Sequence, residues 1–291
     1  MEKIDETFMS FDKPYHQADI VYFGAPFDGT ASFKKGAFFG PKAIREDSYG
    51  LETYSPYQDQ DLETDTKVVD VGDLNFSGMG TEAVLDNINE FIEKIINDDK
   101  IPLMVGGEHL VSYPVVKALK ENYPDLAVIH YDAHMDLRYD YEGDKLSHAT
   151  VMRRIYESID SRSIYQFGIR SGTREEFAFS KEKCHTHLFE VTGSEKLLDI
   201  LRDRPVYITI DLDVLDPGIF SGTGTQEPGG ITFKELLDSI INLDGLNIVG
   251  ADVVELAPNL DNSGVSTSCA CKVVREMAII LSKSRRRRAD G

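Results

Sequence analysis

Acidic residues and histidines directly follow four apolar runs of the sequence, in a spacing that could hold metal ions. The segments concerned are Gly106–Gly107–Glu108–His109, Asp132–Ala133–His134–Met135–Asp136, Asp211–Leu212–Asp213 and Val254–Glu255. In extended backbone, alternate residues point to one side. Asp132, His134 and Asp136 would therefore share one side, as would Asp211 and Asp213.

Together with His109, these residues offer four carboxylates and two imidazoles. Packed together without a cation, the carboxylates would repel one another, and some would stay protonated. Carboxylate and imidazole ligands without thiolate suit Mn²⁺, with Zn²⁺, Co²⁺ or Fe²⁺ as competitors. Two such ions roughly 3.5–4 Å apart can share a water and lower its pKa, so that hydroxide is available near neutral pH.

Each motif taken singly has an ordinary structural interpretation. An isolated Asp-x-Asp after a strand is more often a turn or a helix cap than a ligand pair, and Gly106–Gly107 alone would be a turn. The prediction of a metal site therefore depends on the joint appearance of the motifs, each directly after an apolar run.

The apolar runs themselves read as buried strands of a parallel sheet, because they are continuous rather than alternating. The expected strands are Ile20–Gly24, Val68–Val71, Pro102–Val105, Ala127–Tyr131, Ile164–Phe167, Val206–Ile210 and Ile248–Val253. In such sheets, ligands bind outside the carboxyl ends of the strands, which is where the motifs fall.

Helical patterns lie between the expected strands. Thr81 is expected to cap a helix that runs to about Asp98, Thr232 and Glu235 form a capping box, and a helix is expected from Ser266 to Ser282. The alternation of the two patterns predicts a three-layer α/β/α sandwich with a mostly parallel central sheet, in a single domain over residues 1–291.

The composition limits the possible partners. The formal net charge of −19 repels nucleic acid and anionic lipid and favours the approach of cations. The run Arg285–Arg288 opposes this trend and is interpreted as a solvated tail after the last helix. No apolar run approaches the roughly 20 residues of a membrane helix, the N-terminus does not read as a secretory signal, and the three cysteines form no disulfide framework. We expect a cytoplasmic protein.

At the metal-site motifs the sequence resembles the ureohydrolase (arginase–agmatinase) family, roughly from Tyr22 to Met277. The resemblance implies an arginase-like fold and two manganese ions per subunit, with His109 and Asp136 on one ion and His134 and Asp213 on the other. Asp132 and Asp211 would bridge the two ions. It also implies a homo-oligomer, a trimer or a hexamer.

Three further residues resemble the reaction machinery of that family. Glu255 would grip the guanidinium group, His148 would relay protons or orient the substrate, and Thr225 would help to bind a guanidino nitrogen. The implied reaction is attack of hydroxide on the guanidinium carbon, followed by proton transfer through Asp136 to the departing amine. Without the resemblance, these residues would be read as a surface acid, a histidine at a helix start and part of a flexible turn.

The segments Phe23–Thr30, Gly36–Arg45 and Gly224–Gly230 are similar to those of agmatinases. Arginases hold the amino-acid head group with an Asn and an Asp at positions where this chain has Arg138 and Thr173. The expected substrate is therefore agmatine, a dication that would give putrescine and urea. Other amidinohydrolases (guanidinobutyrase, formiminoglutamase or arginase), a dinuclear phosphoesterase and a non-catalytic metal-binding homologue remain as alternatives.

Overall fold

A computed structural model describes residues 6–159 and 162–290 of the chain. Its centre is an eight-stranded sheet in the order β4-β1-β5-β10-β9-β6-β7-β8, in which neighbouring strands all pair in parallel. The strands of this sheet are β1 Ile20–Ala25, β4 Val68–Asp73, β5 Ile101–Gly106, β6 Ala127–Tyr131, β7 Ile164–Ile169, β8 His185–Leu188, β9 Pro205–Asp211 and β10 Asn247–Val254. A separate antiparallel pair joins β2 (Tyr54–Ser55) to β3 (Gln60–Asp61).

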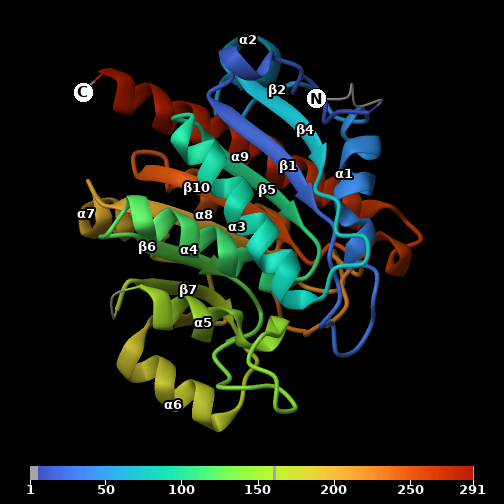
Figure 1. The fold of residues 1–291 in the computed structure, drawn as a ribbon, viewed down its shortest axis with the longest axis vertical. Helices are drawn as coiled ribbons and strands as arrows, with labels where there is room; N and C mark the ends of the chain where they lie inside the picture. The colour runs from blue at the N-terminus through green and yellow to red at the C-terminus, as the bar shows by residue number, and fades with distance from the viewer. Residues whose placement is uncertain (1–5, 160–161, 291) are drawn as a thin grey trace.

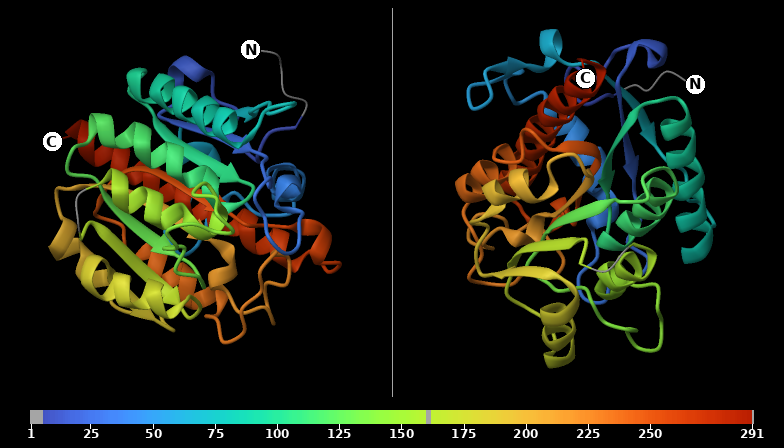
Figure 2. Two further views of the ribbon diagram at one scale, coloured as in Figure 1. Left: turned by 60° about the horizontal axis from the view of Figure 1, so that its bottom comes forward. Right: turned by 90° about the vertical axis from the view of Figure 1, so that its left-hand side faces the viewer.

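Helices cover both faces of the sheet, as Figures 1 and 2 show. The α-helices are α1 Gly40–Ser48, α2 Leu62–Asp65, α3 Thr81–Asn97, α4 Ser112–Asn122, α5 Val151–Ser158, α6 Arg174–Lys183, α7 Leu197–Leu201, α8 Phe233–Ile241 and α9 Val265–Asp290. The short 3-10 helices are η1 Tyr15–Gln17, η2 Ala37–Phe39, η3 His109–Val111, η4 His148–Thr150, η5 Ser194–Lys196, η6 Leu212–Val214 and η7 Pro258–Leu260.

Two hydrophobic clusters fill the space between the sheet and the helices on its two faces. One cluster joins buried side chains of the sheet to α1, α8 and α9, and the other joins the opposite face to α3, α4 and α5. Every residue of β1, β5, β6 and β7 is buried. Burial of both faces explains why the strands read as continuous apolar runs in the sequence. The predicted three-layer sandwich with a parallel sheet is confirmed.

Two predicted helix starts had different outcomes. The capping box of Thr232 and Glu235 is present at the start of α8. The prediction for α3 was wrong by one residue, because Gly80 occupies the N-cap position without a side-chain cap and Thr81 is the first helical residue. The apolar face of α3 is buried through Val84 and Ile88, so packing of that face fixes the helix without a capping side chain.

The prediction of a solvated tail at Arg285–Arg288 was also wrong, because α9 continues through these residues. Arg285 Nη1 donates to Asp99 Oδ1 at 3.0 Å, and Arg287 Nη1 donates to Asp244 Oδ1 at 2.7 Å. These contacts tie the end of α9 to neighbouring segments. The arginines therefore belong to the packed helix and are partly neutralised.

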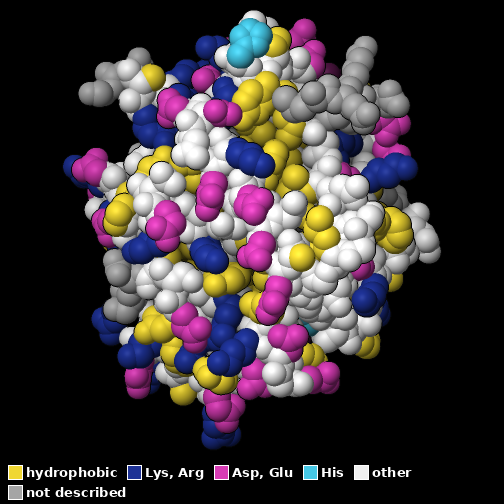
Figure 3. Space-filling view, in the orientation of Figure 1, with side chains coloured by type: hydrophobic (Ala, Val, Ile, Leu, Met, Phe, Trp, Pro, Cys, Tyr) yellow, Lys and Arg dark blue, Asp and Glu magenta, His cyan; other side chains and the backbone are white. Residues whose placement is uncertain are grey.

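The part of the surface that Figure 3 shows carries acidic and basic side chains interspersed with one another. In the described part of the chain, no helix combines the length and the apolar character that a bilayer span requires.

Candidate metal centre and active site

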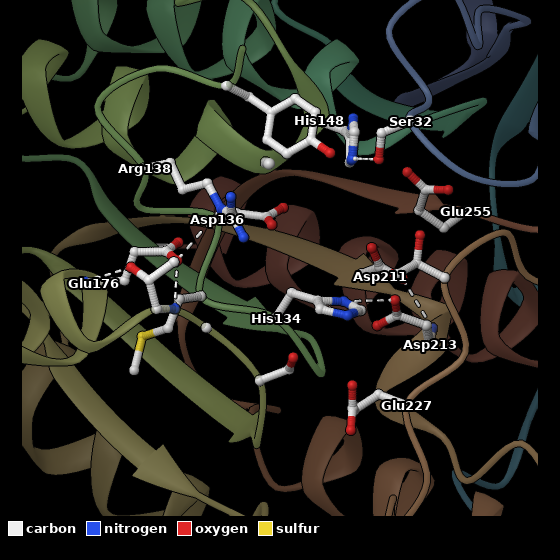
Figure 4. A pocket seen from close by; sticks show the side chains of 17 residues that line it. Ser32, His134, Asp136, Arg138, His148, Glu176, Asp211, Asp213, Glu227 and Glu255 are labelled. Atoms are coloured by element: carbon white, nitrogen blue, oxygen red, sulfur yellow. Dashed lines mark hydrogen bonds and ion pairs between the residues drawn. The ribbon is translucent and has the colours of Figure 1, made fainter.

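Four adjacent strands bring the predicted ligands to one edge of the sheet. β5, β10, β9 and β6 are neighbours and parallel, so their carboxyl ends face the same way. Two residues separate His109, which begins η3, from the end of β5, and Asp132 directly follows β6. Asp211 ends β9, Asp213 lies in η6, and Glu255 directly follows β10. Residues far apart in the sequence therefore meet at a single cavity (Figure 4).

The first half of the centre lies around His109. Its Nδ1 atom is 3.1 Å from Asp132 Oδ2, 3.3 Å from Asp136 Oδ2 and 3.4 Å from Asp211 Oδ2. Despite these neighbours, Nδ1 is buried and has no hydrogen-bond partner among the described residues. Two ligand atoms bonded at about 2.1 Å and about 90° to one cation lie about 3 Å apart. The spacing is thus that of ligands around a cation.

The other nitrogen of His109 fixes the form of the ring. The Thr209 hydroxyl donates to Asp252 Oδ1 at 2.7 Å, and Asp252 Oδ2 accepts a second hydrogen bond from the Tyr207 hydroxyl. A hydroxyl has a single proton. The Thr209 oxygen, 2.9 Å from His109 Nε2, therefore accepts the proton of that nitrogen. With its proton on Nε2, the neutral ring would have its free electron pair at Nδ1, which is the form that binds a metal.

The second half of the centre lies around His134. Its Nδ1 atom is 2.9 Å from Asp213 Oδ2 and 3.5 Å from Asp132 Oδ1. Asp132 thus has one oxygen near each histidine, as a bridging ligand would. His130 lies behind it, with Nε2 2.7 Å from Asp132 Oδ2, and holds that carboxylate in place.

The electrostatics of these carboxylates fit a positively charged occupant. Burial, reinforced by repulsion from Asp132, raises the pKa of Asp136 to about 7. Burial and repulsion from Asp213 and Asp132 raise the pKa of Asp211 well above its ordinary value. Divalent cations would offset both effects by favouring the charged carboxylates. The orphaned Nδ1 atom and this acidic donor set together fit two divalent ions.

Two residues of the centre have left-handed backbone, Asp136 with φ 52° and Glu255 with φ 66°. Such conformations are costly for residues other than glycine and tend to persist where the surroundings fix them. Glu255 is fixed by accepting the His109 N–H at 2.8 Å with Oε1. Burial, followed by repulsion from Glu108, raises the pKa of Glu255 to about 8.

His148 lies at the mouth of the same cavity and is oriented by the loop after β1. Its Nδ1 atom is 2.9 Å from the carbonyl oxygen of Thr30, which can only accept, so Nδ1 carries the proton of the neutral ring. Nε2 is left as an acceptor, 3.1 Å from Ser32 Oγ. Burial lowers the pKa of His148. The residue can therefore take up a proton from the cavity side.

The cavity has a volume of about 320 Å³. Its wall includes Asp136, His148, Thr225 and Glu255, and it also includes Arg138, Thr173 and Glu176, where a substrate could extend away from the centre. His109 and Asp132 are buried behind this wall. The cavity thus places a candidate cation site next to the Glu255 carboxylate and the His148 ring, with room for a small molecule.

A model of the arginase family matches residues 18–280 of this sequence. The chain belongs to the arginase family. It is 48% identical over 278 residues to an agmatinase of Bacillus cereus, a match that covers 94% of this chain and 96% of the relative.

Solved structures agree with this membership of the arginase family. A Clostridium difficile protein gives a TM-score of 0.90 at 46% identity and covers 92% of this chain and 99% of its own. The agmatine ureohydrolase of Thermoplasma volcanium gives a TM-score of 0.86 at 31% identity, covering 99% of this chain and 97% of its own. The resemblance inferred from the sequence motifs is confirmed.

In this arginase-family chain, several residues in or next to the site were not predicted from the sequence. Thr209 and Asp252 lie inside the strand runs Val206–Ile210 and Ile248–Val253, and their polar side chains within buried strands were the available signal. Ser32 lies in a loop without a recognised motif, and Glu227 lies in the agmatinase-like segment Gly224–Gly230 but was not singled out there. Only the folded chain shows that both line the cavity.

Proposed function

We propose that this chain hydrolyses agmatine to urea and putrescine with two manganese ions. The proposal is supported by 48% identity to an agmatinase over nearly the whole chain. The observation that carries it is the juxtaposition of the two histidines, which share Asp132, with Glu255 at the wall of one small cavity.

The proposed ligands divide into two groups that share two carboxylates. His109 and Asp136 would hold one ion, His134 and Asp213 the other, and Asp132 and Asp211 would bridge. Bound there, two divalent cations would supply the Lewis acidity that makes water a nucleophile near neutral pH. Manganese is proposed because the donors are carboxylates and imidazoles without thiolate.

The first task of the protein side chains is to orient the guanidinium group. Glu255 would hold this planar cation by charge-assisted hydrogen bonds and counter its repulsion from the metal centre. Its Oε1 atom accepts the His109 N–H, so that contact aims the carboxylate. Thr225, in the loop between η6 and α8, would contact a guanidino nitrogen.

The second task is proton transfer. The departing amine is a poor leaving group unless it is protonated. Asp136 would carry the proton to the leaving nitrogen, and His148 would exchange protons with the cavity through Nε2. Because burial lowers the pKa of His148, its ring is neutral and able to accept a proton near neutral pH.

The test is urea release from agmatine, arginine and 4-guanidinobutyrate, with and without added Mn²⁺. We expect release from agmatine that depends on the metal, and far less from arginine. Absence of urea from every guanidino compound in manganese-loaded protein would leave a non-catalytic metal-binding protein as the better account.

A second candidate function is hydrolysis of a guanidino acid, and it is favoured by one residue. Arg138 lies in the cavity wall and could pair with a substrate carboxylate. Its Nε atom is 3.6 Å from Glu176 Oε2, and its guanidinium lies over the Tyr141 ring at 5.2 Å, so it already has partners. Higher kcat/KM for 4-guanidinobutyrate than for agmatine would establish this alternative.

The assembly of the chain into a trimer or a hexamer is part of the same proposal. Light scattering on the purified, manganese-loaded protein measures the oligomeric state directly.

A further inference from the structure

One carboxylate in the cavity wall belongs neither to the proposed ligand set nor to any interaction. Glu227 is partly exposed and lines the cavity. Within residues 6–159 and 162–290, its side chain makes no hydrogen bond or ion pair. Figure 4 shows its carboxylate below His134, on the side of the centre opposite Glu255. The carboxylate of Glu227 therefore offers an unpaired negative charge on the side of the proposed guanidinium position that lies away from Glu255.

The other acid away from the metal centre, Glu176, is already used. Its Oε1 atom accepts the Leu137 N–H at 2.9 Å, and its Oε2 atom accepts the Thr173 N–H at 2.8 Å. Oε2 also faces Arg138. Both oxygens of Glu176 are thus occupied by Leu137, Thr173 and Arg138, whereas the carboxylate of Glu227 stays available for a ligand.

The position of Glu227 is fixed through its backbone. Its carbonyl oxygen accepts Arg170 Nε at 3.0 Å and Arg170 Nη2 at 2.7 Å, and Nη2 also donates to the carbonyl oxygen of Asp213 at 2.7 Å. One guanidinium therefore ties the loop of Glu227 to the loop that carries a proposed metal ligand. Asp216 Oδ2 accepts the Gly229 and Gly230 N–H groups and secures the same loop further along. The side chain consequently extends from a fixed backbone.

The charged side chains of the cavity favour one orientation of a long substrate that has a cation at each end. With one cationic end at Glu255, a second cationic end is attracted by the carboxylate of Glu227, whereas the charge of Glu176 is already matched by Arg138. An alkyl ammonium group has three donors and matches an acceptor-only carboxylate. We propose that Glu227 binds the terminal ammonium group of the substrate and so selects guanidino amines over guanidino acids. This inference rests on the proposed guanidino hydrolysis at the same site.

The experiment combines a change in the protein with a change in the ligand. Glu227→Gln keeps the size of the side chain and removes its charge, and pentylguanidine replaces the ammonium group of agmatine by a methyl group. We expect Glu227→Gln to raise KM for agmatine about tenfold to a hundredfold with kcat little changed, as for a lost hydrogen bond between charged groups. Binding of pentylguanidine, measured by its turnover or as competitive inhibition, should be the same in both proteins.

The same comparison works without turnover. Calorimetric titration of the manganese-loaded proteins with agmatine and with pentylguanidine should show the tenfold or greater loss for agmatine alone. A wild-type protein that releases no urea would end the proposed function and leave this comparison intact. Equal affinity of wild type and Glu227→Gln for agmatine would overturn the assignment of Glu227, as would an equal loss for both ligands.

Matched controls come from the loop after Arg138. Asp140 and Glu142 are exposed acids that do not line the cavity. Asp140→Asn and Glu142→Gln should leave KM for agmatine within about twofold of wild type. A tenfold rise in either control with no effect at Glu227 would place the ammonium contact in that loop and refute the proposal. For 4-guanidinobutyrate, Glu227→Gln should raise kcat/KM, because a repulsive charge is removed.

Discussion

At the scale of single residues, the centre depends on which nitrogen of His109 carries a proton. Thr209 takes the proton of Nε2 because its own proton is directed to Asp252. Nδ1, which faces three carboxylates, is thereby the nitrogen left to donate an electron pair to a cation. A threonine that touches no substrate can therefore control metal affinity.

Thr209→Val should weaken manganese binding about 10- to 100-fold, because the oriented hydrogen bond to the ligand histidine is lost. The measurement is the dissociation constant for Mn²⁺, obtained by titration of chelator-treated protein. Thr209→Ser keeps the hydroxyl and should bind the metal nearly as well as wild type. Unchanged affinity in the valine variant would show that the Thr209 contact does not hold the histidine.

Asp211 gives a second prediction at this scale. Asp211→Asn should abolish the increase in unfolding temperature that Mn²⁺ produces in wild type, together with urea release. The metal-free variant should be at least as stable as metal-free wild type, because burial and neighbouring acids raise the pKa of Asp211 and disfavour its charge. Thermal unfolding with and without Mn²⁺ measures both effects. A variant that keeps the manganese-induced increase would rule out Asp211 as a ligand.

At the scale of the elements, helix starts are fixed by local hydrogen bonds where they exist. Thr232 Oγ1 accepts the Glu235 N–H at 3.3 Å, and Glu235 Oε2 accepts the Thr232 N–H at 2.7 Å. Thr173 and Glu176 form a similar capping box at α6, which also lines the cavity. The capping box at α8 contributes to stability alone, whereas the one at α6 also forms part of the cavity wall.

Thr232→Ala should reduce the free energy of unfolding by about 1 kcal/mol, the usual contribution of an N-cap side chain. Chemical denaturation of the metal-loaded protein measures the change. KM for agmatine should stay the same, since Thr232 does not line the cavity. Thr232→Ser should retain most of the stability, and equal losses in the serine and alanine variants would argue against the capping box.

At the scale of the whole molecule, the sheet gathers buried acids whose charges disfavour the metal-free fold. Burial raises the pKa of Asp136 and Glu108 to about 7 and that of Glu255 to about 8. An acid whose pKa is raised in the folded state holds more protons there than in the unfolded chain. Stability then falls as pH rises from the unfolded pKa to the folded pKa.

The metal-free protein should therefore lose stability between about pH 4 and pH 8 on account of these groups. The stabilisation by added Mn²⁺ should grow over the same range, because the cation binds the charged carboxylates. Unfolding temperatures in a pH series, with Mn²⁺ and with a chelator, measure both trends. If the metal-dependent stabilisation does not change with pH, the buried acids do not bind the cation.

The sequence alone was enough to predict the strands that are buried on both faces, because burial on both sides requires continuous apolar runs. It also determined the family, since the acids and histidines follow those runs directly. The edge strand β8 was not predictable, because His185–Leu188 is only partly buried and contains two histidines. Which acids of the cavity wall are left without a partner could be seen only in the folded chain. Glu176 and Glu227 are the same residue type, yet Glu176 accepts the N–H of Leu137 from a distant loop and lies beside Arg138. Glu227 lines the cavity without such a partner among the described residues, because contacts between distant segments form only in the folded chain.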